Sequence, residues 1–116
     1  MKKLLLAFGI VAILILVWFV SDALKPKLFA RVDIKRDSVV ITNGNDTPWE
    51  SPTIILNDAF DGPILEVHGS WQPAERRELQ LREFKRRFNQ QAFNPQFEKV
   101  REVIINVKGF QMSMYR

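Results

Sequence analysis

The sequence predicts an all-β domain that follows one N-terminal transmembrane helix. Two observations carry this prediction. The stretch Leu4–Val20 is an unbroken apolar run without a charged residue, and several later segments alternate apolar and polar residues with the period of two that is typical of half-buried strands. Clusters of Asn, Asp, Gly and Pro separate these segments, as turns separate antiparallel strands. A chain of 116 residues accommodates the helix and one domain with a single core.

The apolar run has the composition of a membrane span. Leu4–Val20 contains 17 residues, near the ~20 that an α-helix needs to cross a bilayer. Hydrocarbon offers no hydrogen-bond partner to the backbone, so a spanning segment of this kind is helical. Lys2-Lys3 precedes the run, and Trp18-Phe19 stands where the aromatic belt of a membrane interface is expected. We assign residues 1–24 to a membrane anchor whose partner is the lipid bilayer, and residues 25–27 to a linker.

A cleaved secretory signal is the alternative to a retained anchor. Ser21-Asp22-Ala23 places small residues at the positions that a signal peptidase recognises, and cleavage near Ala23 would release a secreted domain. The apolar core of a signal usually has ~7–15 residues, and this run is longer, which favours an uncleaved single-pass anchor. Because a short basic N-tail usually stays inside, we expect a cytoplasmic N-terminus and a periplasmic or extracellular domain. The lysines and arginines that follow the run favour the opposite orientation, in which the domain faces the cytoplasm.

The composition after the anchor excludes several classes of chemistry. Without the three lysines and one aspartate of residues 1–25, the chain's 17 Lys/Arg and 13 Asp/Glu become 14 and 12, a net charge of +2. This near balance does not favour nucleic-acid binding. The chain has no cysteine, which excludes disulfides, thiol nucleophiles and Cys-type zinc sites. A small extracytoplasmic domain without disulfides depends on hydrophobic packing.

Period-two alternation and β-branched runs predict the strands, and turn-forming residues predict the loops. Asn43–Pro48 and Asp58–Pro63 are dense in turn formers and are predicted loops. Gly69 suggests a bend within its strand. The predicted strands are Leu28–Ile34, Ser38–Thr42, Pro52–Asn57, Ile64–Trp71 and Val100–Val107, with Phe110–Tyr115 continuing the last of them after Gly109.

One segment, Ala74–Phe88, fits either a helix or a strand. Its Ala, Glu, Arg, Leu and Gln residues are good helix formers, and Pro73 suits a helix start. Leu81, Phe84 and Phe88 also follow helical spacing. As a strand, however, the segment places Leu79 and Leu81 on one face, whereas a helix would leave Leu79 among arginines.

A set of short motifs resembles a known kind of domain. The motifs are Ile41-Thr42-Asn43 with Trp49 six positions after the Asn, Pro73-Ala74-Glu75, Leu79 with Phe84, and Phe93-Asn94-Pro95. In this order they resemble the small, mostly uncharacterised bacterial domains that have an immunoglobulin-like or fibronectin-like fold and often follow a membrane span. The resemblance implies an antiparallel β-sandwich of about six to seven strands within residues 28–116. It also favours a strand over Leu79–Phe84.

The chain departs from this pattern at two positions. Such domains usually carry Gly where Ala74 stands, and an Asp-Gly turn where this chain has Gln90-Gln91-Ala92. A short helix over Arg86–Gln91 is therefore an alternative to the turn. We interpret the motif residues as architecture rather than catalysis, since a Trp at a loop–strand junction covers a core and an Asn can bond its own loop. The predicted structural residues are Asn43, Trp49, Trp71, Phe84, Phe93 and Pro95.

Candidate catalytic and metal-binding residues are sparse, and we expect no enzyme activity and no cofactor. His68 is the only histidine, and no serine lies in a nucleophile-elbow motif. Asp58 and Asp61 lack the alternating oxygen spacing of a calcium loop and are interpreted as a solvated turn, as are Asn43, Asn45 and Asp46.

A basic cluster is the main candidate for an interaction surface. Three acids, Glu75, Glu78 and Glu83, are interleaved with it, so one interpretation is a solvated strand face that guards a sheet edge. The other is a patch for anionic lipid or an acidic protein. The six cations are Arg76, Arg77, Arg82, Lys85, Arg86 and Arg87.

We therefore expect a membrane-anchored β-sandwich that serves as a binding or structural accessory of the cell envelope. The alternative is a cytoplasm-facing domain that docks through Arg76–Arg87. A protein partner fits either reading of the cluster. Nucleic acid is not expected, because an outward-facing domain would not meet it.

Overall fold

The computed structural model describes residues 25–116, and all statements on structure below concern this part of the chain. The anchor expected in residues 1–24 lies outside it. Within residues 25–116 no helix is both long and apolar enough to cross a bilayer.

The described chain is built from antiparallel strands, which confirms the all-β prediction. They form a three-stranded sheet in the order β1-β2-β7, a two-stranded sheet of β3 and β6, and a four-stranded sheet in the order β5-β4-β8-β9. The elements are β1 (Ala30–Ile34), β2 (Ser38–Asn43), β3 (Trp49–Glu50), β4 (Thr53–Leu56), β5 (Ile64–Glu66), β6 (Ser70–Trp71), β7 (Arg76–Gln80), the 3₁₀ turn η1 (Leu81–Glu83), β8 (Val103–Asn106) and β9 (Ser113–Tyr115).

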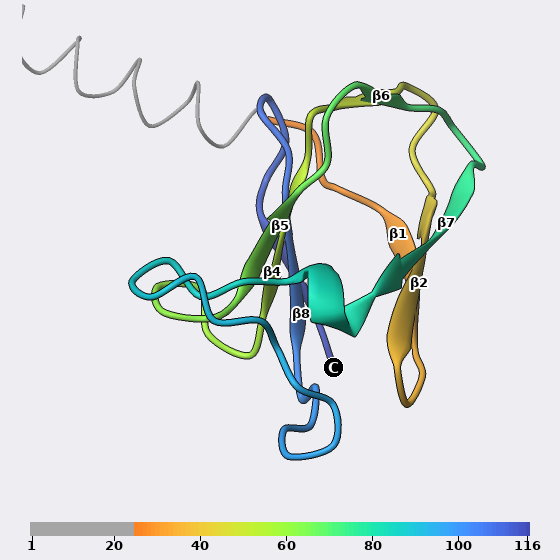
Figure 1. Cartoon of the computed structure of the whole chain (residues 1–116). Coiled ribbons are helices and arrows are strands. Elements are labelled where there is room, and N and C mark those ends of the chain that lie inside the picture. The colour runs from red at the N-terminus through yellow and green to blue at the C-terminus, as the bar shows by residue number, and fades with distance from the viewer. Residues whose placement is uncertain (1–24) are drawn as a thin grey trace, which may run out of the picture.

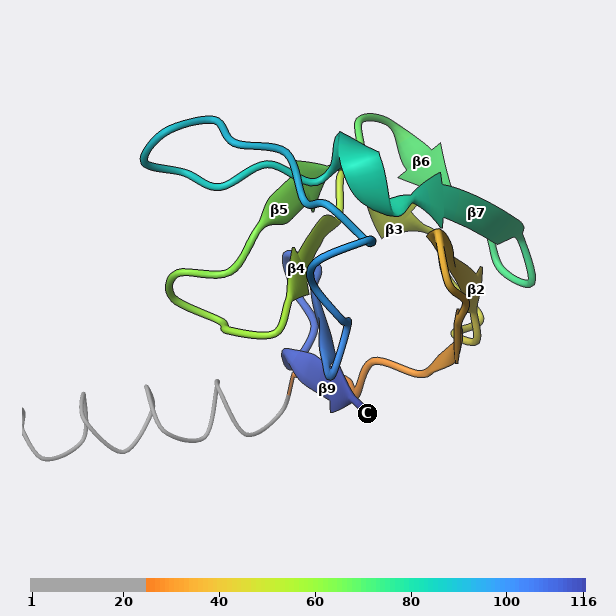
Figure 2. The same ribbon diagram turned by 60° about the horizontal axis from the view of Figure 1, so that its bottom comes forward.

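The two larger sheets lie on opposite sides of one hydrophobic core (Figure 1). Val39 and Ile41 of β2 enter it from one sheet, and Ile54 of β4 and Ile105 of β8 enter it from the other. All four side chains are fully buried. In the view of Figure 2, the strands surround this core. Alternation is clear in β1, where Ala30, Val32 and Ile34 pack against the core and Arg31 and Asp33 are exposed. In β2, β4 and β8 the residues between the core positions are buried as well.

Several strand predictions are correct in place, and three differ in detail. The segment Ile64–Trp71 is not one strand but two, β5 and β6, because the chain bends at Gly69, where φ is +90°. Phe110–Tyr115 does not extend β8; β9 turns back and pairs with β8 through Ile104↔Met114. Of Leu79–Phe84, only the start belongs to strand β7, and η1 follows.

The short helix considered for Arg86–Gln91 is absent, and a turn takes its place. The N–H of Arg86 donates to Gln91 C=O at 2.9 Å, and Lys85 bridges to Ala92 in antiparallel fashion. Gln90 has a φ of +57°, a left-handed conformation for which glycine is usually preferred. Gln90 therefore occupies a turn position that glycine would fill at lower conformational cost.

The two-stranded sheet pairs two buried tryptophans at one end of the core. Trp49 of β3 lies directly opposite Trp71 of β6, with ring centroids 5.4 Å apart and planes tilted by 57°. Both rings are fully buried, and both indole N–H groups are bonded. Trp49 donates to Asn45 Oδ1 at 3.1 Å, and Trp71 donates to the C=O of Glu75 at 2.8 Å. A buried ring whose polar edge is satisfied contributes packing without a desolvation penalty.

Asn43 joins the segments around these tryptophans. Its side chain is buried and donates to the C=O groups of Thr47 and Trp71 at 3.1 and 3.0 Å. Its Oδ1 accepts the N–H of Asn45 at 2.8 Å, and its own C=O accepts the N–H of Ala74 at 2.8 Å. One side chain and its backbone thus hold the end of β2, the following loop and the β6–β7 turn together.

The Pro73-Ala74-Glu75 motif forms a tight turn between β6 and β7. The N–H of Glu75 donates to the C=O of Gln72 at 3.0 Å, and Ala74 has a φ of +62°. Proline at the second position and a left-handed residue at the third are the signature of a type II turn. Ala74 therefore occupies a position that glycine would fill at lower conformational cost.

Replacing Ala74 by glycine should stabilise the domain. Ala74→Gly removes the steric cost of a left-handed alanine, about 1–2 kcal/mol, and adds the entropic cost of glycine, about 0.5–1 kcal/mol. The free energy of unfolding should therefore rise by about 0.5–1 kcal/mol. Ala92→Gly is the matched control, because Ala92 is exposed and not left-handed; glycine there should lower stability by about 0.5–1 kcal/mol. Chemical unfolding of the full chain in detergent measures both. A loss of stability in Ala74→Gly would contradict the turn assignment.

Candidate functional site

The structure distributes the six predicted basic residues over different surfaces. Arg76 and Arg77 lie on β7, next to the tryptophan end of the domain. Arg82 lies in η1, and Lys85, Arg86 and Arg87 lie in the loop that follows it. The last four therefore share a region, and the first two do not belong to it.

Arg76 and Arg77 face opposite sides of β7. Arg76 is exposed and borders a shallow hollow of about 270 Å³ on the outer face of the sheet, together with Arg31, Asp33 and Thr42. Arg77 is half-buried, and its guanidinium carbon lies 5.0 Å from the ring centroid of Trp71. At this distance a cation is attracted to the negative face of the ring.

Arg77 also forms an ion pair with Glu75. Its Nε donates to Glu75 Oε2, and its Nη2 donates to the C=O of Ser70 at 2.9 Å. The other carboxylate oxygen of Glu75 accepts the N–H of Gln72 at 2.9 Å. The hydrogen bond from Arg77, followed by the one from Gln72, holds the pKa of Glu75 below its ordinary value of 4.5. This cation is thus engaged in the β6–β7 turn.

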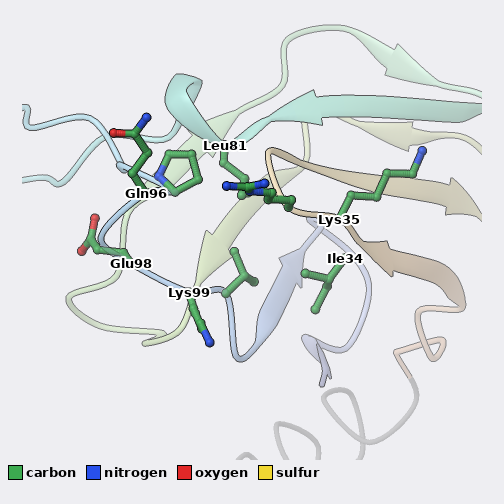
Figure 3. A pocket seen from close by; sticks show the side chains of 9 residues that line it. Ile34, Lys35, Leu81, Gln96, Glu98 and Lys99 are labelled. Carbon is green, nitrogen blue, oxygen red and sulfur yellow. The ribbon is translucent and has the colours of Figure 1, made fainter.

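A groove opens at the other end of the domain, between η1, the end of β1 and the segment before β8 (Figure 3). Its volume is about 570 Å³. Ile34 and Leu81 enter it from opposite sides, and Gln96 and Glu98 flank it (Figure 3). The apolar lining residues are Ile34, Leu81, Pro95 and Val100, and the polar ones are Lys35, Arg36, Gln96, Glu98 and Lys99.

The charge around this groove is predominantly positive. Its one carboxylate, Glu98, is bonded by the guanidinium of Arg86 and by the N–H of Asn94, so its charge is compensated internally. No ion pair of the described residues involves Lys35, Arg36 or Lys99. A second hollow of about 370 Å³ shares Arg36, Pro95 and Gln96 with the groove and adds Asp37, Gln80 and Arg82.

The Phe93-Asn94-Pro95 motif builds one wall of the groove. Phe93 is buried in the core, and its N–H donates to the C=O of Phe84 at 2.8 Å. Asn94 begins a turn in which its Oδ1 accepts the N–H of Gln96 at 3.0 Å and its C=O accepts the N–H of Glu98 at 2.9 Å. The turn places Pro95 and Gln96 at the groove and leaves Phe97 85% exposed.

Sequence reasoning missed most of this groove. The sequence predicts Ile34 and Val100 only as strand ends, and it does not single out their neighbours Lys35, Arg36 and Lys99 as part of a site. The two sets lie far apart in the chain, and they meet because the sheet that contains β1 and the sheet that contains β8 pack on the same core, against which both Ile34 and Val100 lie. The only signal within the sequence was the density of cations at Lys35-Arg36.

The other candidate constellations have internal roles. Asp58 Oδ1 accepts the N–H groups of Phe60 and Asp61 at 2.9 and 3.4 Å, as expected for a turn-capping carboxylate. Asn57 Oδ1 accepts the N–H of Arg101 at 2.6 Å. His68 is exposed next to Gly69. Among residues 25–116, no three His, Cys, Asp or Glu side chains converge on a position for a metal ion.

Comparisons of the chain with protein-family models, with curated proteins and with solved structures found no match. The function is therefore inferred from the residues and their geometry.

The Glu75–Arg77 pair should make stability depend on pH. Because the folded state lowers the pKa of Glu75, the pair stabilises the fold above the ordinary pKa of 4.5, and this contribution is lost as the pH falls through the lower folded-state pKa. Glu75→Gln cannot ionise, so it should unfold at a lower temperature than the wild type at about pH 7 and at the same temperature at about pH 2.

Glu83→Gln serves as the control, because Glu83 is exposed and forms no ion pair within the described chain. Its melting temperature should follow that of the wild type across the same pH range. A Glu75→Gln variant that melts with the wild type at neutral pH would show that the pair contributes nothing.

Proposed function

We propose that this chain is a single-pass membrane protein whose domain, residues 28–116, is an immunoglobulin-like β-sandwich that binds or supports a partner in the bacterial cell envelope, without catalysis. The two sheets on either side of one core support the sandwich assignment. The apolar run Leu4–Val20 supports the anchor.

The observation that carries the proposed role is the position of the groove relative to the start of the domain. Gln111, in the β8–β9 turn, bonds the C=O groups of Lys25 and Pro26 at 3.1 and 3.0 Å, so the chain enters at that end. The groove lies at the opposite end, where β1 finishes (Figure 1). In a protein anchored through residues 1–24, the groove would therefore point away from the bilayer and toward a partner.

A second candidate function has some support at the same end of the domain. Phe88 and Phe97 are 91% and 85% exposed, and both belong to loops that carry or flank the cations Arg86, Arg87 and Lys99. Aromatic side chains next to cations favour the surface of an anionic membrane. Since this end would point away from the anchoring bilayer, a domain on the cytoplasmic side would use it to dock on an acidic protein or on the anionic lipid of a second, facing membrane.

Cysteine labelling distinguishes these topologies, because the natural chain has no cysteine. A single cysteine in the variant Phe88→Cys, at a 91% exposed site, should react with a membrane-impermeant maleimide in intact spheroplasts. Lys2→Cys should react only after the membrane is permeabilised. This labelling pattern would place the N-terminus in the cytoplasm and the domain outside it, as proposed.

The reverse labelling pattern would support the cytoplasm-facing alternative and contradict the proposal. Mass spectrometry of the same samples tests the anchor. A mature chain that lacks the residues up to Ala23 would identify the segment as a cleaved signal and the domain as secreted.

A further inference from the structure

The outer side of β1 carries backbone groups that no strand pairs. β1 is an edge strand, with β2 on one side and no strand on the other within the described chain. The N–H of Gly44 donates to the C=O of Phe29 at 2.8 Å, and the N–H of Lys35 donates to the C=O of Ser38 at 2.9 Å. Bonded and non-bonded pairs alternate in an antiparallel ladder, so the odd-numbered residues of β1 bond to β2.

The even-numbered residues of β1 consequently direct their N–H and C=O groups away from β2. The first of this series, Leu28, has its C=O bonded by the hydroxyls of Ser113 and Tyr115 at 3.3 and 3.4 Å, which closes the edge there. Ala30, Val32 and Ile34 have no such partner among residues 25–116, and their side chains are only half-buried against the core. Three residues of strand edge are therefore open to pairing.

This edge lacks the usual protection against an added strand. Natural edges often carry inward-facing charges, a proline or a bulge, but the inward side chains here are Ala30, Val32 and Ile34. The charged residues of β1, Arg31 and Asp33, are on the outer face and balance each other. An incoming strand would find apolar side chains on the core side and unpaired backbone along the edge.

The edge also leads into the groove. Ile34 is the last residue of β1 and part of the groove lining, where Lys35, Arg36 and Lys99 supply positive charge that no ion pair within the described part of the chain balances. A segment that extends along β1 would pass these cations at one end. Its backbone would be held by the strand edge, and its end would be selected by charge.

We propose that β1 accepts an added antiparallel strand from a partner protein, and that the segment carries acidic residues at the end that reaches the groove. This inference rests on the proposed role as a binding module and names the partner's chemistry. Apolar residues would alternate along its core-facing side, next to Val32 and Ile34.

Two other occupants fit these features less well. A lipid anion would satisfy the cations but not the row of backbone donors and acceptors on Ala30, Val32 and Ile34. A second copy of this chain would offer its own β1, flanked by Lys27 and by Lys35-Arg36, so cations would meet cations. The acidic peptide alone complements both the edge and the groove.

The test uses the full chain in phosphatidylcholine nanodiscs and a fluorescent synthetic peptide of about ten residues, three glutamates followed by alternating threonine and valine. The anisotropy of the peptide should report saturable binding. A peptide with lysines in place of the glutamates should bind about tenfold more weakly or not at all. A peptide N-methylated at alternate amides should lose binding, because it cannot pair with a strand.

Matched variants locate the site. Lys99→Glu should weaken peptide binding about tenfold, whereas Lys108→Glu, at the other end of β8, should not. Val32→Pro removes an N–H that faces away from β2, so it should abolish binding while tryptophan fluorescence shows a folded domain. If Val32→Pro fails to fold, the comparison of Lys99→Glu with Lys108→Glu still tests whether the peptide binds at the groove.

Equal binding of the N-methylated peptide, or of the wild type and Lys99→Glu, would overturn the proposal. So would Lys99-dependent binding to separate phosphatidylglycerol vesicles without peptide binding, or a dimer that Val32→Pro dissociates. These measurements are made in vitro and do not depend on orientation in the cell. The labelling experiment can therefore contradict the proposed orientation while peptide binding still supports strand addition. Equally, peptide binding can fail while the labelling supports the proposed orientation.

Discussion

The buried amide of Asn43 is the interaction on which this domain depends most. A primary amide removed from water costs free energy unless its donors and acceptor are bonded. Asn43 meets this condition by bonding Thr47, Trp71 and Asn45, and its backbone bonds the turn at Ala74. Because these groups come from separate segments, the cost is offset only when all the segments are in place. That requirement makes folding of the end that contains the tryptophan pair cooperative, so its loops do not form independently of one another.

This junction makes the two ends of the domain different. At one end, Asn43 and the tryptophan pair close the core, and even the cation Arg77 is committed to Trp71 and Glu75. At the other end, the chain before β8 stands apart from the end of β1, and a cation-rimmed groove remains open. A closed end supplies stability, and an open end is free to bind. The proposed binding role rests on this difference between the two ends.

The sequence predicts much of the fold because alternation is a strong local signal. Ala30, Val32 and Ile34 pack against the core while Arg31 and Asp33 between them are exposed, so the period of two of this strand is visible without a structure. The prediction fails where the local signal is short or mixed. Trp49–Glu50 is a strand of two residues that pairs only with the two-residue strand Ser70–Trp71, and no pattern of that length is distinctive.

The segment that follows β7 shows a second kind of limit. Leu79, Leu81 and Phe84 are all buried, which neither a single strand nor a long helix achieves. The chain solves this with a strand that ends at Gln80 and a single 3₁₀ turn, which brings residues three apart to the same side. The groove is less predictable still, because Ile34 and Val100 become neighbours only through the pairing of sheets.

Native-state hydrogen exchange on the full chain tests the role of Asn43 most directly. The amides of Asn45 and Ala74 lie outside regular strands, yet both donate to Asn43 at 2.8 Å. We predict that they exchange only on global unfolding, as the amides of β2 do, while the exposed Phe88 amide exchanges freely. Exchange of Asn45 and Ala74 as fast as that of Phe88 would show that the junction opens locally, and the central claim would be wrong.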